Sequence, residues 1–337
     1  MKAIALISGG LDSTLAAKII KELGIELVAL NTKTPFCLCD HHSSSGCVSA
    51  AANAAKQLGL KLITLNVSEE FIAIIKKPRH GYGSHMNPCI DCRILLFKKA
   101  KEYLEKEQAA FIITGEVLGQ RPMSQRKAAM KLIDKKSGTE GLVLRPLCAK
   151  FMDISIPEKN GWVSRDKLLA ICGRSRGAQF SLAKELGIND YPCPSGGCLL
   201  TNAEFSKRVK DLIKHNELNV HNAHLLKVGR HFRLSSVAKL IVGRNETENS
   251  RLLDLAEDRD HLFTPRDEIA GATALGIGLY NEELVNLAAR ITGRYCDLGG
   301  DGCTEINYKS GFNAKESTVS RFSVDPVEEG LLKSLRI

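Results

Sequence analysis

The sequence predicts an open parallel α/β sheet flanked by helices, followed by a smaller C-terminal α+β domain. Its 337 residues are too many for one ordinary hydrophobic core, so two or more domains are expected. Over the first 120 residues, short apolar runs alternate with helical patterns, which is typical of parallel strands joined by crossover helices. This pattern changes further along the chain. We therefore expect domains at residues 1–202 and 203–337.

Four short apolar runs and three helical patterns define the first domain. Strands are expected at Ala3–Ile7, Glu26–Leu30, Lys61–Val67 and Ala110–Thr114. Helices are expected at Ser13–Leu23, Val48–Leu58 and Cys92–Lys106. Ligands of open parallel sheets bind at the carboxyl ends of the strands. The functional site is therefore expected in the segments that follow the strands, namely Ser8–Gly10, Asn31–Pro35 and Thr114–Gly119.

The later part of the chain has a different order of elements. Two short helices are expected at Arg165–Cys172 and Gln179–Leu186, before a loop rich in Pro and Gly at Asp190–Gly197. The second domain is expected to contain a first helix, two strands and two further helices. These lie at Phe205–His215, Leu225–Leu234, Ala238–Val242, Glu248–Ala256 and Glu282–Thr292.

Composition indicates a cytoplasmic protein with no membrane partner. The apolar fraction of 44% and the charged fraction of 25% are those of globular proteins. Apolar runs such as Phe111–Ile113 are too short to cross a bilayer, and Met1–Ile4 leads directly into a strand, without room for a signal peptide. In a reducing compartment, the 11 cysteines favour metal binding or thiol chemistry over a disulfide framework.

The positive charge of the chain indicates a polyanionic partner such as RNA. The formal net charge is +9, and residues 1–200 carry 28 Lys and Arg against 18 Asp and Glu. Neutralisation of phosphates supplies most of the non-specific affinity for nucleic acids. Candidate RNA contacts are the basic residues Arg121, Lys127 and Arg145 in the first domain and Lys227, Arg230 and Arg233 in the second. A solvated surface explains these residues equally well.

The segment Ser8-Gly9-Gly10-Leu11-Asp12-Ser13-Thr14 predicts a phosphate-binding loop between the first strand and the first helix. Its glycines allow the backbone N–H groups to point at an anion, and the start of the helix adds further donors. No Lys follows the glycines, which excludes the common Gly-Lys-Ser/Thr nucleotide loop. We expect the loop to bind ATP, with Asp12 holding Mg²⁺ because a carboxylate suits this hard cation. Asn31, Gly115 and Gln120, near the ends of other strands, are expected to contact the nucleotide.

Two groups of cysteines are candidates for chemistry. Cys89 and Cys92 lie in the first turn of a predicted helix, on one face, where the helix dipole favours thiolates. Cys198 follows two glycines and is a candidate third ligand, with Cys193 as its competitor. A second group consists of Cys37, Cys39 and Cys47, which form either a second metal site or reduced thiols in a surface loop.

Four motifs in order resemble the PP-loop ATP pyrophosphatases that thiolate tRNA, a family that includes the 2-thiouridine and 4-thiouridine synthetases. They are Ser8–Thr14, Asn87–Cys92, Thr114–Gln125 and Gly196–Thr201, and the resemblance covers residues 1–205. It implies the adenine nucleotide alpha hydrolase-like fold and an activity in which a uridine carbonyl oxygen is adenylated and then replaced by sulfur. In this resemblance Asp12, Cys89, Cys92 and Cys198 are the catalytic residues.

The sequence departs from part of this family at two places. Cluster-free 2-thiouridylases carry Asp-x-x-Cys where this chain has Cys89-x-x-Cys92. This resembles the iron–sulfur members, in which three thiolates, here Cys89, Cys92 and Cys198, hold a 4Fe–4S cluster whose fourth iron binds hydrosulfide. The N-terminal RNA-binding domain typical of 4-thiouridine synthetases is not seen, while residues after 205 are similar to an RNA-binding domain found in some relatives.

The sequence therefore predicts ATP-dependent thiolation of tRNA, with ATP, Mg²⁺ and a 4Fe–4S cluster, and with sulfide or a sulfur carrier as donor. One alternative is a ligase or nitrile-forming enzyme of deazaguanine synthesis with cysteine-bound zinc. Another is a non-catalytic protein that binds ATP or RNA. The modified uridine, the carbonyl exchanged and the oligomeric state are left open.

Overall fold

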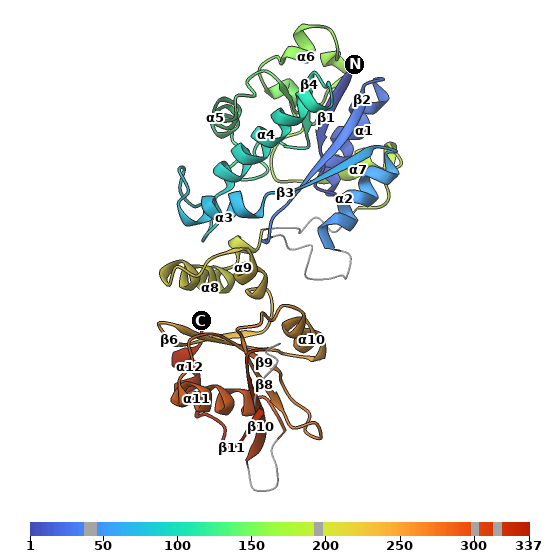
Figure 1. The fold of residues 1–337 in the computed structure, drawn as a ribbon. Helices are drawn as coiled ribbons and strands as arrows, with labels where there is room; N and C mark the ends of the chain where they lie inside the picture. The colour runs from blue at the N-terminus through green and yellow to red at the C-terminus, as the bar shows by residue number, and fades with distance from the viewer. Residues whose placement is uncertain (37–45, 192–197, 298–302, 313–318) are drawn as a thin grey trace. The chain divides into compact units, whose positions relative to one another are not determined.

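The computed structural model describes residues 1–36, 46–191, 198–297, 303–312 and 319–337, without the side chains of residues 46–49. The chain divides into two compact units, Met1–Asn202 and Ala203–Ile337. Each unit has its own sheet and its own hydrophobic core (Figure 1). No helix among the described residues is long and apolar enough to span a bilayer.

The first unit is built on a five-stranded parallel sheet in the order β3-β2-β1-β4-β5. Its strands are β1 (Lys2–Leu6), β2 (Glu26–Lys33), β3 (Lys61–Asn66), β4 (Phe111–Thr114) and β5 (Val143–Leu144). The predicted open parallel α/β sheet is confirmed. The chain adds strands on one side of β1 and then on the other, so the carboxyl end of β1 lies at the switch point where such sheets bind ligands.

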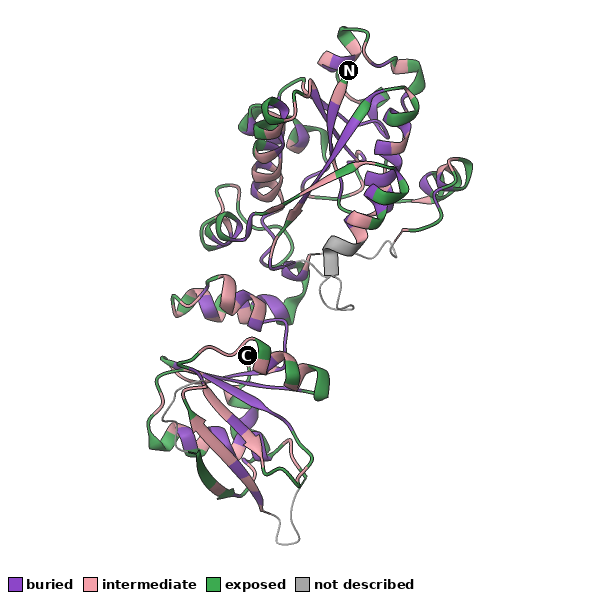
Figure 2. Ribbon diagram, turned by 45° about the vertical axis from the view of Figure 1, so that its right-hand side comes forward, coloured by how far each residue is buried: buried purple, intermediate pink, exposed green. Residues whose placement is uncertain are grey.

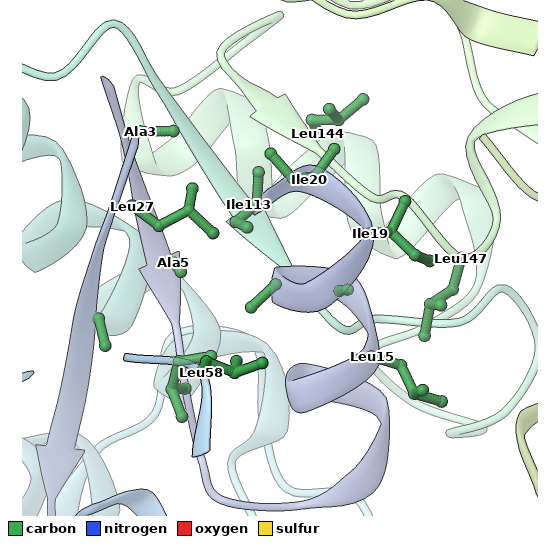
Figure 3. Packing of buried hydrophobic residues seen from close by; sticks show 14 of the residues in the cluster. Ala3, Ala5, Leu15, Ile19, Ile20, Leu27, Leu58, Ile113, Leu144 and Leu147 are labelled. Atoms are coloured by element: carbon green, nitrogen blue, oxygen red, sulfur yellow. The ribbon is translucent and has the colours of Figure 1, made fainter. Parts of the chain in front are cut away.

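Helices cover both faces of this sheet, because side chains of a strand alternate between its faces. Ala3 and Ala5 of β1 pack against Ile20 and other residues of α1 in one core cluster, which Figure 3 shows. Ile4 belongs to the cluster on the opposite face, with Phe97 of α4. The helices of the unit are α1 (Leu11–Glu22), α2 (Gly46–Gln57), α3 (Ser68–Lys76), α4 (Cys89–Lys106), α5 (Lys127–Ser137), α6 (Ile156–Lys159) and α7 (Gly177–Glu185). Strands β1, β2 and β4 are largely buried, whereas the edge strand β3 is half-exposed (Figure 2).

The prediction of a helix over Arg165–Cys172 is wrong. Only one 3-10 turn forms there, at Arg165–Lys167. The rest of the segment is held by neighbouring backbone, since Leu169 N–H donates to Pro146 O at 2.9 Å and Ile171 N–H donates to Leu147 O at 2.8 Å. These long-range hydrogen bonds replace the helical ones.

The second unit contains a six-stranded antiparallel sheet in the order β11-β10-β8-β9-β7-β6. Its strands are β6 (Arg230–Ser235), β7 (Ala238–Val242), β8 (His261–Pro265), β9 (Ala274–Gly278), β10 (Thr304–Ser310) and β11 (Val319–Val324). Its helices are α8 (Ala203–Lys214), α9 (Val220–Leu225), α10 (Glu246–Asp254), α11 (Glu282–Gly293) and α12 (Glu329–Leu335). The apolar side of α11 packs with Phe232 and Phe263 in the core of this unit.

The prediction of one strand over Leu225–Leu234 is wrong in its first half. Leu225 ends α9, a turn follows, and β6 begins at Arg230. Asn219 caps α9, because its side chain accepts a hydrogen bond from Asn222 N–H. Gly229 then has a φ of 73°, which glycine adopts at little cost, and its turn lets β6 begin at Arg230. The sequence prediction therefore missed the helix and the turn.

Candidate nucleotide and cysteine site

The loop between β1 and α1 presents the start of a helix to the switch point of the sheet. Gly9 has a φ of 79°, and a Cβ there would lie 2.4 Å from the carbonyl carbon of Ala50, so only glycine fits. Gly10 is the N-cap of α1 and supplies no side-chain cap. The hydroxyls of Ser13 and Thr14 donate to Gly10 O at 2.8 and 3.1 Å. This arrangement leaves helix-start N–H groups for an anionic ligand.

Asp12 is the acidic group of this loop and one of its oxygens is unsatisfied. Gln120 Nε2 donates to Asp12 Oδ2 at 2.6 Å, and Gln179 Nε2 donates to Gln120 Oε1 at 3.1 Å. Asp12 Oδ1 and Asn31 Nδ2 are buried and have no hydrogen-bond partner among the described residues. Such orphaned groups are costly unless a ligand satisfies them. The carboxylate oxygen and the amide therefore fit Mg²⁺ and the polar groups of ATP, respectively.

Residue 115 has to be a glycine because a larger residue would not fit there. A Cβ at Gly115 would lie 2.4 Å from Asp12 C and Ser13 N, so the chain after β4 passes directly against the start of α1. This close passage brings Gln120 to Asp12. Gln179 on α7 is a part of the site that the sequence analysis missed, because it is 59 residues away from Gln120 and no local motif marks it.

Cys89 and Cys92 lie in the first turn of α4 and are half-buried. Burial raises the pKa of Cys89, while Arg121 and Arg93 oppose the shift. Burial also raises the pKa of Cys92 to about 11. Burial of the two thiols therefore opposes the expected preference for thiolates at this helix start.

Backbone hydrogen bonds connect the segment after Cys198 with the segment before α4. Met86 N–H donates to Leu200 O at 3.1 Å, and Leu199 N–H donates to Phe36 O, also at 3.1 Å. Cys198 thus lies two residues from Leu200, which contacts Met86, three residues before Cys89. Within the described ranges, no group of three or more His, Cys, Asp or Glu is arranged to hold a metal ion.

Three predicted thiols fall outside what is described. Cys37, Cys39 and Cys193 lie outside the described residues, and Cys47 is in α2 but its side chain is not described. The second metal site and the choice between Cys193 and Cys198 therefore stay predictions.

Arg121 lies within electrostatic range of two further arginines, Arg93 and Arg176, and of Asp12 and Cys89. Arg121 follows Gln120, Arg93 follows Cys92, and Arg176 is the N-cap of α7, one turn before Gln179. Although Arg121 is exposed as a residue, desolvation of its guanidinium and then the charges of Arg93 and Arg176 lower the pKa of Arg121. Arg121, expected to contact RNA, therefore lies at the nucleotide and cysteine site. The sequence analysis missed Arg93 and Arg176.

Two family models match separate parts of the chain. Residues 1–154 match the model described as thiamine biosynthesis protein (ThiI), and residues 229–333 match the NFACT protein RNA binding domain. The first unit is ThiI-like. The chain thus joins a ThiI-like PP-loop ATP pyrophosphatase domain to an RNA-binding domain. No curated protein matches the sequence.

Several solved structures are similar to parts of the chain. A 4-thiouridine synthetase in complex with RNA and bound ATP has 19% identity and a TM-score of 0.40, covering 67% of this chain and 52% of that one. This chain thus spans about half the length of that synthetase. The U34-tRNA thiolase NcsA from Methanococcus maripaludis, with its 4Fe–4S cluster, has 17% identity and a TM-score of 0.32, covering 67% of this chain and 70% of that one. The C-terminal part of the fibronectin/fibrinogen-binding protein from Streptococcus suis has 13% identity and a TM-score of 0.27, covering 73% of this chain and 97% of that one.

Arg145 is not a surface residue of the ThiI-like unit, contrary to its expected role in RNA binding. Its side chain is 3% exposed. Its Nε donates to Glu116 Oε2 at 3.0 Å, and its two Nη atoms donate to Asp134 at 2.9 and 2.7 Å. Glu116 also pairs with Arg93 at 3.5 Å. Arg145 therefore supports the chain after β4 from inside the unit and cannot reach an RNA phosphate.

Lys127 remains on the surface of the ThiI-like unit. It is exposed, its Nζ donates to Phe151 O at 3.0 Å, and it lies 3.7 Å from Asp153 Oδ1. Its contact with RNA stays a prediction.

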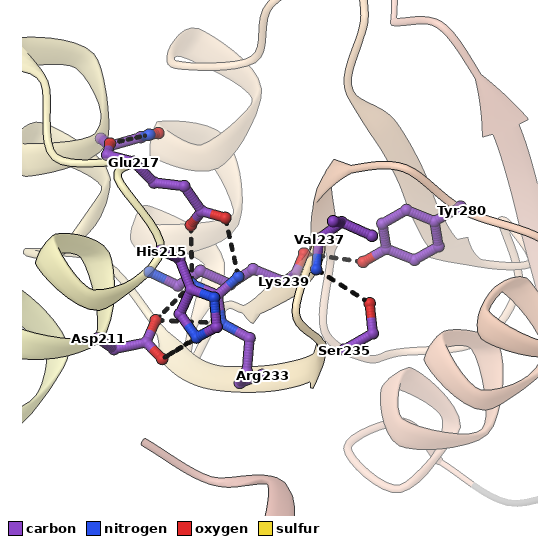
Figure 4. A network of polar contacts seen from close by, with 9 residues as sticks. Asp211, His215, Glu217, Arg233, Ser235, Val237, Lys239 and Tyr280 are labelled. Atoms are coloured by element: carbon purple, nitrogen blue, oxygen red, sulfur yellow. Dashed lines mark hydrogen bonds and ion pairs between the residues drawn. The ribbon is translucent and has the colours of Figure 1, made fainter.

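Two of the three basic residues of the second unit that were expected to contact RNA are occupied inside the unit. Lys227 is 5% exposed, and Arg233 is held by Asp211 and by Glu217 at 2.7 Å, as Figure 4 shows. These two residues are therefore not available to phosphates, because one is buried and the other is neutralised. Arg230 donates to Gly243 O at 3.0 Å, and its guanidinium lies 4.4 Å from the ring centre of Tyr295.

Lys239 of β7 belongs to the same network and is expected to make stability depend on pH. Its side chain is almost fully buried beside Asp211, Glu217, Arg233 and Arg208. Burial lowers the pKa of Lys239 from its usual 10.5 to about 7. Between these two pH values the unfolded chain binds more protons than the folded one, so stability rises with pH. Replacing Lys239 with Met should flatten this rise, as measured by denaturant unfolding at a series of pH values.

Lys333→Met provides the matched control, because Lys333 lies on α12 and is largely exposed. It should keep the pH dependence of the unmodified protein. Equal slopes for the Lys239→Met variant and the unmodified protein would show that Lys239 is protonated when folded.

Proposed function

We propose that the protein is an ATP-dependent tRNA sulfurtransferase that exchanges a uridine carbonyl oxygen for sulfur. The proposal rests on one observation. Gln120 and Arg121 are neighbours in the chain, and they connect the nucleotide loop with the cysteine turn. Gln120 donates to Asp12, and Arg121 lies within electrostatic reach of both Asp12 and Cys89. We infer that a nucleotide bound beside Gln120 and Arg121 would reach both ATP and the cysteines. The matches to a ThiI family model and to an RNA-binding domain support tRNA as substrate.

The nucleotide loop performs the first half of the proposed reaction. The N–H groups at the start of α1 hold the phosphates of ATP, and Asp12 Oδ1 holds Mg²⁺. The uridine carbonyl oxygen attacks the α-phosphorus, the bond to the β-phosphate oxygen breaks, and pyrophosphate leaves. This step is needed because a uracil carbonyl oxygen is a poor leaving group, whereas AMP is a good one. Arg93, Arg121 and Arg176 offset the negative charge of the phosphates that meet there.

The cysteine turn performs the second half. Sulfur from sulfide or a sulfur carrier adds to the activated carbon, and AMP leaves with the original oxygen. We place a 4Fe–4S cluster on Cys89, Cys92 and Cys198, and when bound it would supply an open iron that holds hydrosulfide. Thiols are the donor type that holds such a cluster, and Arg93 and Arg121 near Cys89 suit its negative charge. The three thiols are not gathered around one point in the structure as described, so binding of the cluster would draw them together. The turn before α4 and the segment after Cys198 are joined by the Met86–Leu200 hydrogen bond.

The function is tested directly on tRNA. Unmodified tRNA incubated with the protein, Mg-ATP and sulfide without oxygen should yield a thiouridine, detected by mass spectrometry of the digested nucleosides. Omitting ATP should prevent its formation. Nucleosides without sulfur in the complete reaction, together with unchanged thiouridines in tRNA from a deletion strain, would contradict the proposal.

A further inference from the structure

Three arginines of the second unit gather around one short segment of chain. Arg208 of α8 donates from Nη1 to Leu226 O at 3.2 Å. Arg244, two residues after β7, donates from Nη2 to Gly229 O at 2.9 Å. Arg336 pairs through its backbone with Phe232, three residues after Gly229. We call Arg208, Arg244 and Arg336 the arginine cluster. Leu226 and Gly229 both belong to the connection between α9 and β6, so the side chains of Arg208 and Arg244 converge there.

The arginine cluster has more positive charge than its neighbours neutralise. The carboxylates that act on Arg208 are Glu204 and Glu248. Glu204 already pairs with Lys207 at 2.8 Å. Glu248 accepts from the backbone N–H of Arg244 at 2.9 Å and pairs with Nη1 of the same arginine at 3.3 Å, so one carboxylate faces the three arginines. Desolvation, followed by the charges of Arg244 and Arg336, lowers the pKa of Arg208. This contrasts with Arg233, which two carboxylates neutralise.

The arginine cluster also has donors left for a ligand. Arg208 Nε is buried and has no hydrogen-bond partner among the residues that the structure describes. Arg336 is exposed, and the Arg244 side chain is 42% exposed. Arginine guanidinium groups present several planar donors that match phosphate oxygens. A bound phosphate would reduce the repulsion between the arginines and would accept a hydrogen bond from Arg208 Nε. The arginine cluster therefore fits a phosphate ligand.

We propose that the arginine cluster is the site where the second unit holds the phosphate backbone of its RNA. The match to an RNA-binding domain covers residues 229–333, which include Arg244 but neither Arg208 nor Arg336, and it names no residue. The inference rests on the proposed function for the choice of tRNA as ligand. Contacts to phosphates position an RNA without reading its sequence, so the cluster should hold many tRNAs alike.

The test measures binding of a fluorescein-labelled tRNA transcript by anisotropy over a range of salt concentrations. The Arg244→Gln/Arg336→Gln variant changes two exposed members and leaves the partly buried Arg208 in place. It should bind about tenfold more weakly at low salt, and the slope of log affinity against log salt should fall by about two. Adding Arg208→Gln should weaken binding further. Circular dichroism and the affinity for ATP in the absence of tRNA should stay as in the unmodified protein, which shows that the fold is kept.

Arg266→Gln is the matched control. Arg266 is an arginine of the same unit with a similarly exposed side chain, but it pairs with Glu268 and Glu305 beyond β8, so its loss should leave the salt slope unchanged. An unchanged slope in the double variant, or displacement of tRNA by polyglutamate as effective as by polyuridylate, would overturn the inference. Binding that depends on these arginines without any thiouridine product would instead contradict only the proposed function.

Discussion

Replacement of Asp12 by Asn is expected to slow cleavage of ATP to AMP and pyrophosphate by about a hundredfold to a thousandfold. Asn keeps an oxygen that can accept the hydrogen bond from Gln120, which is 2.6 Å long in the structure. It removes the negative charge from the oxygen that is buried without a partner among the described residues. Mg²⁺ binding should therefore weaken while the fold is retained. Release of labelled pyrophosphate from ATP, with tRNA present, measures the effect, and Asp12→Ala should be at least as severe.

Asp153→Asn is the matched control for this experiment. Asp153 is an exposed aspartate of the same unit that pairs with Lys131 at 2.7 Å, away from the nucleotide loop. Its replacement should leave the rate within about twofold, as for most surface changes. A fully active Asp12→Asn variant would remove Asp12 from the site. ADP and phosphate as products of the unmodified protein would show a different class of ATPase.

Replacement of Cys89, Cys92 or Cys198 by Ala is expected to end sulfur transfer. Each change removes one of three thiol ligands, and a cluster that has only two protein ligands is poorly held. Protein purified without oxygen should be brown, with iron and sulfide bound, and each variant should lose the broad visible absorption. Cleavage of ATP should be affected less than thiolation, because the nucleotide loop and Gln120 are untouched. Absorption spectra, iron analysis and nucleoside mass spectrometry measure the three results.

Cys172→Ala is the control, because Cys172 is exposed and lies on a segment remote from α4 in the chain. It should keep both colour and activity. Colourless protein that holds zinc would favour the zinc-dependent alternative. Full activity of the Cys198→Ala variant would make Cys193 the next candidate.

Local sequence was sufficient for the parts of the site that are continuous in the chain. The loop Ser8–Thr14 and the Cys89–Cys92 turn each depend on a few neighbouring residues, namely glycines at a strand end and a Pro before a helix. The same holds for strands such as β7, whose predicted and observed bounds are identical at Ala238–Val242. β-Branched and apolar runs bounded by glycines and polar residues specify these elements locally.

Tertiary structure decided which charged groups are accessible and which are neutralised. Arg145 and Arg233 appeared in the sequence as free basic residues, but carboxylates far along the chain, such as Glu116 for Arg145, pair with them. Arg208 and Arg336 carry no local signal, yet the fold brings Arg208 to the connection before β6 and Arg336 to Phe232 in β6 itself. The sequence determined the type of nucleotide loop and the alternation of strands and helices, because these depend on neighbouring residues. The contacts of each charge depend on which distant segments pack together, and only the folded chain determines that.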